Sequence, residues 1–268
     1  PRTLAMTLYG DLEVSVIDEL PAGRKPIQTV HRYDKDRLKV FGFIQEEIKK
    51  GRQVYIVYPL IEESQSLDLK NLMDGYESIA RAFPQVPLSI VHGGMKADAK
   101  DYEMQRFVKG ETKIMVATTV IEVGVNVPNA SVMIIENAER FGLSQLHQLR
   151  GRVGRGAEQS YCILMSKVEL SRDSRVRLDT MVRTNDGFEI AQVDLDLRGP
   201  GELDGTRQSG ILDLKLADIR QDEAILIAAR HEVVQWLEKD ELLMSESSNP
   251  IRLELAKTPN RTVWAKIS

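Results

Sequence analysis

The chain has 268 residues, of which 42% are hydrophobic and 28% charged, and its formal net charge is −4. This composition is that of an ordinary globular protein with one large domain or two modest ones. No apolar run is long enough to cross a bilayer, so we expect no membrane association. The net negative charge excludes a generic nucleic-acid coat, and any contact with phosphates must come from local features.

A single cysteine, Cys162, excludes an internal disulfide, and the four histidines have no spacing suited to a metal site. We therefore expect a cytoplasmic protein without a structural metal. The chain starts at Pro1 with neither an initiator methionine nor a signal sequence. This start predicts that the chain is part of a longer polypeptide.

Five short runs of apolar and β-branched residues are bounded by polar residues, glycine or proline, which predicts strands. They are residues 53–61, 88–92, 113–118, 132–137 and 160–166. Helical spacing of apolar residues between them is typical of parallel βαβ units covered on both faces. The predicted fold class is therefore α/β, an open parallel sheet. Its ligands should collect beyond the carboxyl ends of the strands, in the loops after Thr118 and Asn137.

Four helices are expected in this body, at residues 35–50, 69–83, 143–149 and in a segment capped by Asp98. After about Lys167 the pattern becomes mainly helical, with helices at 171–183 and 218–237. The last helix has an apolar side that should dock against another surface. The predicted organisation is a linker at 1–30, an α/β domain at 31–167 and a helical segment at 168–268.

The sharpest motif is residues 148–156 (QLRGRVGRG), with three arginines and three glycines beside a predicted helix. Glycines allow close approach of the backbone, and arginines supply fixed donors suited to phosphate oxygens. The motif indicates a phosphate-facing loop, or alternatively a turn with solvated arginines. Residues 117–128 (ATTVIEVGVNVP) leave a strand and present Thr118 and Thr119, which could hold a nucleic-acid phosphate.

These two segments, in this order, resemble motifs V and VI of superfamily 2 helicases. The surrounding sequence resembles the RecG family over nearly the whole chain. Supporting segments are 9–12 (YGDL), 55–61 (YIVYPLI), 92–95 (HGGM) and 107–111 (FVKGE). The resemblance implies a RecA-like second motor domain. The related transcription-repair coupling factor lacks the YGDL sequence at 9–12, which disfavours it as an alternative family for this chain.

The resemblance also implies roles for individual residues. Arg152 and Arg155 would act as arginine fingers on ATP, and Gln148 would sense the nucleotide. The nucleotide site would also include Glu122, Gly124 and Asn126. DNA would contact Thr118, Thr119, His92 and Gly93. ATP and Mg²⁺ would be held mainly by a first motor domain that is absent from this chain.

Residues 184–188 (TNDGF), 197–202 (LRGPGE) and 205–210 (GTRQSG) resemble the translocation motif of the same family. That motif is a helical hairpin and loop, with Arg177, Arg198 and Gln208 as its polar couplers. The alternative is that these arginines are ordinary surface charges.

The chain has no Gly-Lys dipeptide, and hence no loop of the G-x-x-x-x-G-K-[ST] type to hold ATP phosphates. We therefore expect this piece to be inactive alone. The resemblance implies that it serves an ATP-dependent helicase that remodels branched DNA, such as stalled forks and junctions. Its partners would be DNA and the first motor and wedge domains of the same protein, which is expected to be a monomer. The alternatives are a coupling-factor motor, a non-catalytic module docking on a partner ATPase, and a small-molecule enzyme, which lacks a catalytic constellation.

Overall fold

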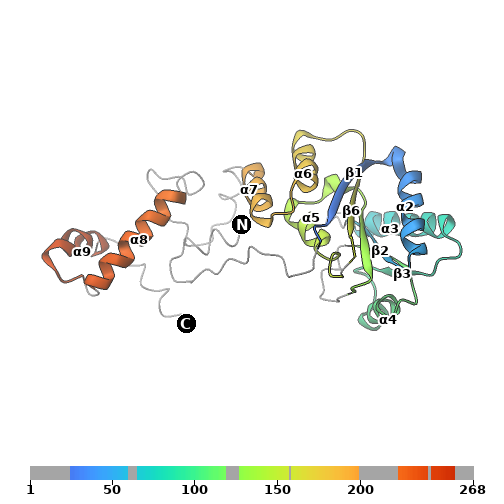
Figure 1. The fold of residues 1–268 in the computed structure, drawn as a ribbon, viewed down its shortest axis with the longest axis horizontal. Coiled ribbons are helices and arrows are strands. Elements are labelled where there is room, and N and C mark those ends of the chain that lie inside the picture. Colours follow the sequence, from blue (N-terminus) through green and yellow to red (C-terminus); the bar gives the residue numbers. More distant parts are fainter. Residues whose placement is uncertain are drawn as a thin grey trace. The chain divides into compact units, whose positions relative to one another are not determined.

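A computed structural model of the chain describes residues 25–59, 65–118, 127–156, 158–198, 223–240 and 243–256. The chain divides into two compact units, residues 1–205 and 206–268. The described residues of the first unit form a layered α/β body, and those of the second form helices (Figure 1).

The first unit alternates strands and helices along most of its length. Its strands are β1 Gln28–Tyr33, β2 Gln53–Tyr58, β3 Leu88–Val91, β4 Ile114–Thr118, β5 Ala130–Ile135 and β6 Tyr161–Ser166. Its helices are η1 Asp34–Asp36, α2 Arg37–Lys49, α3 Gln65–Ala82, α4 Ala97–Val108, η3 Ala138–Arg140, α5 Leu143–Arg150, α6 Arg172–Arg183 and α7 Gly187–Arg198.

The six strands form one parallel sheet in the order β1-β6-β5-β2-β4-β3. The register pairs Tyr58 with Thr118 and Val91 with Ala117, so β2, β3 and β4 end at the same edge. This confirms the predicted open parallel sheet. All residues of β2, β4 and β5 are buried, as expected for strands covered on both faces.

Two apolar cores lie on the two faces of the sheet. Helices α2 and α3 cover one face, with Ile44 and Leu72 fully buried. Helices α4, α5, α6 and α7 cover the other face, where Phe107, Leu146 and Leu178 are fully buried. The helices α6 and α7, which follow the last strand, therefore share a core with the sheet.

Three local predictions need correction. Strand β1 was missed because it lies at the sheet edge with most of its residues partly exposed, and it carries no continuous apolar run. Helix α7 was missed in the glycine- and aspartate-rich stretch, where Asp186 accepts a hydrogen bond from the Phe188 backbone N–H at 2.8 Å. Helix α4 begins at Ala97, so Asp98 lies in its first turn and does not cap it.

The remaining helices follow the predictions more closely. Helix α6 is capped by Ser171, whose Oγ accepts from the Ser174 N–H at 3.2 Å. The first unit includes α6 and α7, whereas the predicted domain boundary falls at 167/168, and that boundary stays a prediction.

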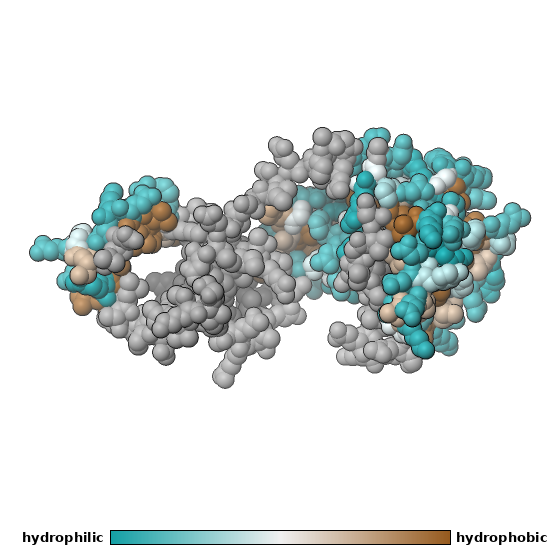
Figure 2. All heavy atoms as spheres, turned by 90° about the horizontal axis from the view of Figure 1, so that it is seen from below, coloured by the Kyte–Doolittle hydropathy of each residue, from teal (hydrophilic) through white to brown (hydrophobic). Residues whose placement is uncertain are grey.

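The second unit contains α8 Glu223–Lys239, η5 Glu246–Ser248 and α9 Asn249–Ala256. The turn after α8 is organised by Asp240, which accepts hydrogen bonds from the backbone N–H groups of Met244 and Ser245 at 2.8 and 2.9 Å. Hydrogen bonds from the Ser245 and Ser248 hydroxyls, and then these backbone hydrogen bonds, lower the pKa of Asp240. Figure 2 shows apolar surface on this unit, to which Ile225 and Val233 of α8 contribute, 66% and 55% exposed.

None of the described helices is both long and apolar enough to cross a membrane. Within the same described ranges, the structure contains no group of three or more histidine, cysteine or acidic side chains arranged to hold a metal ion.

Candidate functional site

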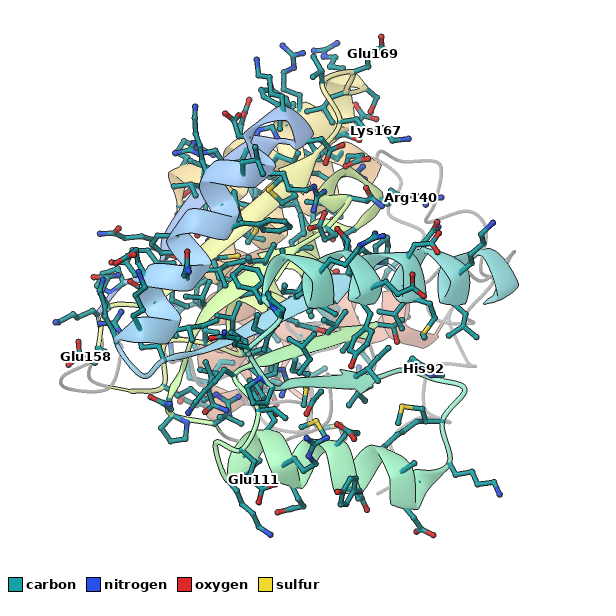
Figure 3. All side chains as sticks on the ribbon, turned by 90° about the vertical axis from the view of Figure 1, so that its right-hand side faces the viewer. His92, Glu111, Arg140, Glu158, Lys167 and Glu169 are labelled. Carbon is teal, nitrogen blue, oxygen red and sulfur yellow. The ribbon has the colours of Figure 1, made fainter. Side chains whose placement is uncertain are left out.

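The motif residues lie at two opposite edges of the sheet. His92 follows the tip of β3 at the carboxyl edge, whereas Glu158 lies just before β6, at the amino edge (Figure 3). The residues between α5 and β6 include the arginine motif, so the arginine loop also lies at the amino edge. The loops after Thr118 and Asn137, where we expect ligands, lie at the carboxyl edge. The arginine loop lies at the amino edge, because a loop that leads into a parallel strand lies at the edge where that strand begins.

The arginine loop (residues 151–156) packs closely against the segments that lead into β1 and β5. Gly154 has a φ of +81°, and a Cβ there would lie 2.9 Å from Cγ1 of Ile27. A Cβ on Gly156 would lie 2.7 Å from the carbonyl oxygen of Pro128. Only glycine fits at these two positions without displacing a neighbour. The glycines of the motif therefore fix the loop against Ile27 and Pro128.

A buried ion pair anchors the segment that follows the arginine loop. Arg52 donates to Glu47 Oε2 at 2.6 Å and to the carbonyl oxygen of Gln159 at 3.2 Å, and the Glu47 side chain is 1% exposed. Gln159 in turn donates from Nε2 to the carbonyl oxygen of Pro26 at 2.8 Å. The loop is thus held from α2 on one side and from the segment before β1 on the other.

Arg152 and Arg155, the expected arginine fingers, are both half-buried on this loop. Burial raises the pKa of Tyr55 to about 12, and the positive charges of Arg155 and Arg152 oppose that rise. Both guanidinium groups therefore lie within electrostatic range of Tyr55, near the start of β2. Among the described residues, Arg155 makes no hydrogen bond or ion pair. Gln148 lies on the last turn of α5 with its side chain exposed.

The expected DNA-contacting residues that are described lie together at the carboxyl edge. Thr118 ends β4, and the strand register places His92 beside it. The Thr118 side chain is buried, and its Oγ1 has no hydrogen-bond partner among the described residues. His92 has its pKa lowered by burial and by the charge of Lys100, which donates to the Gly93 carbonyl oxygen at 3.1 Å.

A buried ion pair stabilises the same edge. Arg37, the first residue of α2, donates to both carboxylate oxygens of Glu136, at 2.7 and 2.8 Å. The Glu136 side chain is 5% exposed. Because Glu136 directly follows β5 and its N–H bonds the Val57 carbonyl oxygen at 2.8 Å, the pair links α2 to two central strands. No motif in the sequence indicated this pair.

Arg150, the first arginine of the motif, does not face a ligand. It is only 2% exposed, and its Nη1 donates to the carbonyl oxygens of Met181 and Thr184 at 2.9 and 2.8 Å. Its Nη2 contacts Nδ1 of His147 at 3.1 Å. Burial lowers the pKa of Arg150 and also that of His147. The helical spacing from Leu143 through Leu146 and His147 to Arg150 was the signal in the sequence that this arginine points inward.

Arg177, one of the expected couplers, binds the backbone at the other edge. Its Nη2 donates to the Glu139 carbonyl oxygen and to Ser174 Oγ, both at 3.0 Å. Ser174 Oγ also donates to the Glu139 carbonyl oxygen, at 3.3 Å. Arg177 therefore ties α6 to the turn after β5.

The structure does not describe the remaining predicted site residues. Thr119, Glu122, Gly124, Asn126 and Gln208 lie outside the described residues, and so does the side chain of Arg198, although its backbone ends α7. Their predicted roles are neither supported nor contradicted by the structure.

A parallel sheet of this kind, covered by helices on both faces and with an arginine loop before its last strand, has the fold of a RecA-like domain. In agreement, residues 38–157 match the family described as "Helicase conserved C-terminal domain". Residues 184–268 match the family described as "ATP-dependent DNA helicase RecG, domain 3, C-terminal". The class is therefore the second motor domain of a helicase.

The chain belongs to the RecG family. It is 50% identical over 254 residues to the ATP-dependent DNA helicase RecG of Synechocystis, covering 94% of this chain and 30% of that protein. It is 46% identical over 260 residues to RecG of Bacillus subtilis, covering 96% and 38%. RecG of Escherichia coli K12 is 52% identical over 227 residues, covering 84% and 33%. The chain thus spans about a third of the length of these relatives.

A solved structure of RecG bound to a three-way DNA junction is similar to this chain. The TM-score is 0.66 and the sequence identity is 43%, over 84% of this chain and 29% of that one. The chain is therefore similar to a RecG protein in fold as well as in sequence.

Proposed function

We propose that this chain is the C-terminal motor part of an ATP-dependent DNA helicase that remodels branched DNA. The observation that carries the proposal is the arginine loop, which packs closely at Gly154 and Gly156 against one edge of a RecA-like sheet. The relatives are named ATP-dependent DNA helicases, and a similar RecG binds a three-way junction. The motor of a coupling factor is the weaker alternative, because the curated relatives described above are RecG proteins.

The described residues fit a nucleotide phosphate at the amino edge. Arg152 and Arg155 carry permanent charge on a half-exposed loop, and Arg155 has no carboxylate partner among the described residues. ATP, when bound with Mg²⁺ mainly by the first motor domain, supplies the free energy of phosphate hydrolysis. In the proposal, Arg152 and Arg155 place positive charge at the phosphates, and Gln148, Glu122, Gly124 and Asn126 complete this side of the cleft.

The carboxyl edge fits the DNA backbone in the proposal. The Thr118 hydroxyl is buried without a partner among the described residues, and His92 and the exposed Gly93 lie next to it. With Thr119, these residues would hold phosphates without reading sequence. Arg177, Arg198 and Gln208 would couple cleft movement to translocation.

The sheet itself separates the two proposed sites. A strand of six residues such as β5 spans about 20 Å. Phosphates of the nucleotide and of the DNA would therefore be held at opposite ends of the same strands. A change at the nucleotide would have to be transmitted through the domain to reach the DNA.

The remaining parts of the proposal concern the whole protein. The first motor domain and a wedge domain of the same polypeptide would be the partners of this chain, with domain limits at 1–30, 31–167 and 168–268. The protein would act as a monomer in the cytoplasm.

The test is the Arg155→Ala variant of the full-length protein. Because an arginine finger contributes ~10³ to 10⁵ in kcat, DNA-stimulated ATP hydrolysis should fall by about that factor, while nucleotide affinity changes much less. Arg81→Ala is the matched control, because Arg81 is exposed on α3 at the opposite face of the sheet. Unchanged turnover in Arg155→Ala would refute the assignment.

A further inference from the structure

The turn after α2, residues 51–53, is fixed at the amino edge of the sheet. Gly51 has a φ of +83° and ends α2, with its N–H donating to the Ile48 carbonyl oxygen at 2.8 Å. Gln53 is 1% exposed, and its Nε2 donates to two backbone carbonyl oxygens at 2.6 and 2.8 Å. The turn is therefore anchored on both sides of Arg52.

The same turn also binds the segment that leads into β5. Asn129 of that segment donates from Nδ2 to the Gly51 carbonyl oxygen at 2.8 Å. The Asn129 carbonyl oxygen in turn accepts from the Gln53 N–H at 3.0 Å. Because Pro128 faces Gly156 of the arginine loop, the segment held by the turn is also the one on which the arginine loop packs.

Arg52, between the two anchored residues, is directed at the residues that follow the arginine loop. Its guanidinium donates to the Gln159 carbonyl oxygen at 3.2 Å and to the Glu158 carboxylate at 3.1 Å. A third bond, to Glu47 of α2 at 2.6 Å, holds the guanidinium in place, because the Glu47 side chain is 1% exposed. Arg52 therefore links a buried group of α2 to the exit of the arginine loop.

Arg52 is itself not available to a nucleotide. Its side chain is 16% exposed, and its charge is compensated by Glu47 and Glu158. Glu47 also pairs with Lys50 at 2.7 Å, so the buried carboxylate keeps a cation when Arg52 is changed. Any effect of Arg52 on hydrolysis must therefore pass through the position of the arginine loop.

The start of the arginine loop is attached on the opposite face of the sheet. The loop leaves α5 through turns in which the N–H groups of Gly151 and Arg152 donate to carbonyl oxygens of α5, both at 3.0 Å. Helix α5 packs on one face of the sheet and α2 on the other. The loop is thus held at its start from one face and at its end from the other, and the two attachments together define where its arginines lie.

We propose that Arg52 is a positioning residue, which sets the arginine loop from the α2 side so that Arg152 and Arg155 meet the phosphates of the nucleotide. A guanidinium suits this role because its planar fork holds a carboxylate and a carbonyl group at once in fixed geometry, which the single ammonium group of lysine does not. The inference rests on the proposed function, since it assumes that the arginines of the loop act on the nucleotide.

The experiment measures hydrolysis and nucleotide affinity in the full-length protein. In Arg52→Lys the kcat of DNA-stimulated ATP hydrolysis should fall by about tenfold to a hundredfold, because a small misplacement of a catalytic group has an effect of that size. The affinity for ADP should remain that of the wild type. Arg106→Lys is the matched control and should keep the wild-type kcat, since Arg106 also bridges two carboxylates, those of Glu103 and Glu111, but on α4. Unchanged kcat in Arg52→Lys overturns the proposal.

A transition-state analogue gives a readout without turnover. Aluminium fluoride bound together with ADP mimics the phosphoryl group during transfer, which is the state that arginine fingers stabilise. In Arg52→Lys the affinity for this complex should fall by about the same factor as kcat, with ADP alone unaffected. Equal affinity of wild type and variant for the analogue overturns the proposal.

A merely structural role for Arg52 predicts that kcat follows the loss of stability. Glu47→Gln separates the two, because it removes the buried charge and lowers the Tm, while its amide oxygen still accepts from Arg52 and leaves the contact with Gln159 intact. Glu47→Gln should therefore have a kcat near that of the wild type despite a lower Tm than Arg52→Lys. A kcat that falls in the order of the Tm values overturns the proposal.

A further variant decides if Arg52→Lys does not fold. Glu158 is 72% exposed, so Glu158→Lys should fold, and the new charge repels the Arg52 guanidinium from the exit of the loop. The kcat should fall in this variant too, and an unchanged value overturns the proposal. Failure of the proposed function appears elsewhere, as unchanged turnover in Arg155→Ala. A loss in Arg155→Ala without a loss in Arg52→Lys defeats this inference alone.

Discussion

Arg37 and Glu136 form a two-pronged ion pair that closes the carboxyl edge of the sheet, with N–O distances of 2.7 and 2.8 Å. The Glu136 side chain is 5% exposed and that of Arg37 33% exposed, so loss of Arg37 leaves an almost buried carboxylate without its cation. The pair therefore gives a stability prediction that does not depend on the proposed function.

Arg37→Ala should lower the free energy of unfolding by about 2–3 kcal/mol, because hydrogen bonds to a buried charge are lost. Denaturant unfolding measures this change. Arg37→Met combined with Glu136→Gln should be less destabilised than Arg37→Ala, since no unpaired charge remains. Equal losses in the two proteins would contradict an ionic role for the pair.

The three glycines of the arginine loop should differ in their tolerance of alanine. Gly154→Ala and Gly156→Ala should each cost about 1–3 kcal/mol, because a Cβ would meet Ile27 or the Pro128 backbone. Gly151 has a helical φ of −67°, and the nearest atoms to a Cβ there are at 3.5 Å. Gly151→Ala is therefore the control, expected within about 0.5 kcal/mol of the wild type in thermal unfolding.

Thr118→Val tests whether the buried hydroxyl at the end of β4 serves a ligand. Valine has nearly the same shape and removes a polar group that has no partner among the described residues, so stability should be unchanged or slightly higher. Binding of the full-length protein to branched DNA should nevertheless weaken, by about 1–2 kcal/mol for one lost hydrogen bond to a charged phosphate. Wild-type affinity in a folded variant would argue against a DNA contact at this position.

His147 predicts a dependence of stability on pH. Burial, and then the charge of Arg150, lowers the pKa of His147 below its ordinary value of 6.5. Between the folded and unfolded pKa values the unfolded chain binds more protons, so the stabilisation is complete above pH 6.5 and is lost as the pH falls below it. Protonation also removes the acceptor that Arg150 uses.

The corresponding measurement is the Tm of wild type and His147→Gln at about pH 7.5 and about pH 5.5. Glutamine keeps an acceptor but does not titrate, so the drop in Tm on acidification should be smaller in the variant. His31 and His92 also have pKa values lowered by burial, and some drop should remain. His231→Gln, on the exposed surface of α8, is the control that should follow the wild type.

Much of the fold could be predicted because parallel strands covered on both faces are continuous apolar runs. All five predicted strands start within two residues of those observed and end within three. The missed strand, β1, depends on pairing with β6, which lies more than a hundred residues further along the chain. Only tertiary pairing makes that polar segment a strand.

The arginine motif could be recognised in the sequence, but its geometry could not. The motif identified the arginine loop, yet charge and glycine content cannot tell which arginine turns inward. Arg150 continues the buried face of α5, which its helical spacing indicates, but its hydrogen-bond partners are carbonyl oxygens at the end of α6, which the sequence of α5 does not reveal. Likewise, the edge occupied by the loop follows from the direction of the next strand and not from the motif.

Ile27 occupies a corner at which three parts of the chain converge. Its side chain faces Gly154, and its carbonyl oxygen accepts a hydrogen bond from Asn185 Nδ2 at 3.3 Å, in the turn between α6 and α7. The polypeptide leading into β1 is thus clamped between the arginine loop and the helical hairpin. A displacement of Ile27 would therefore act on the arginine loop and on the turn between α6 and α7 at once.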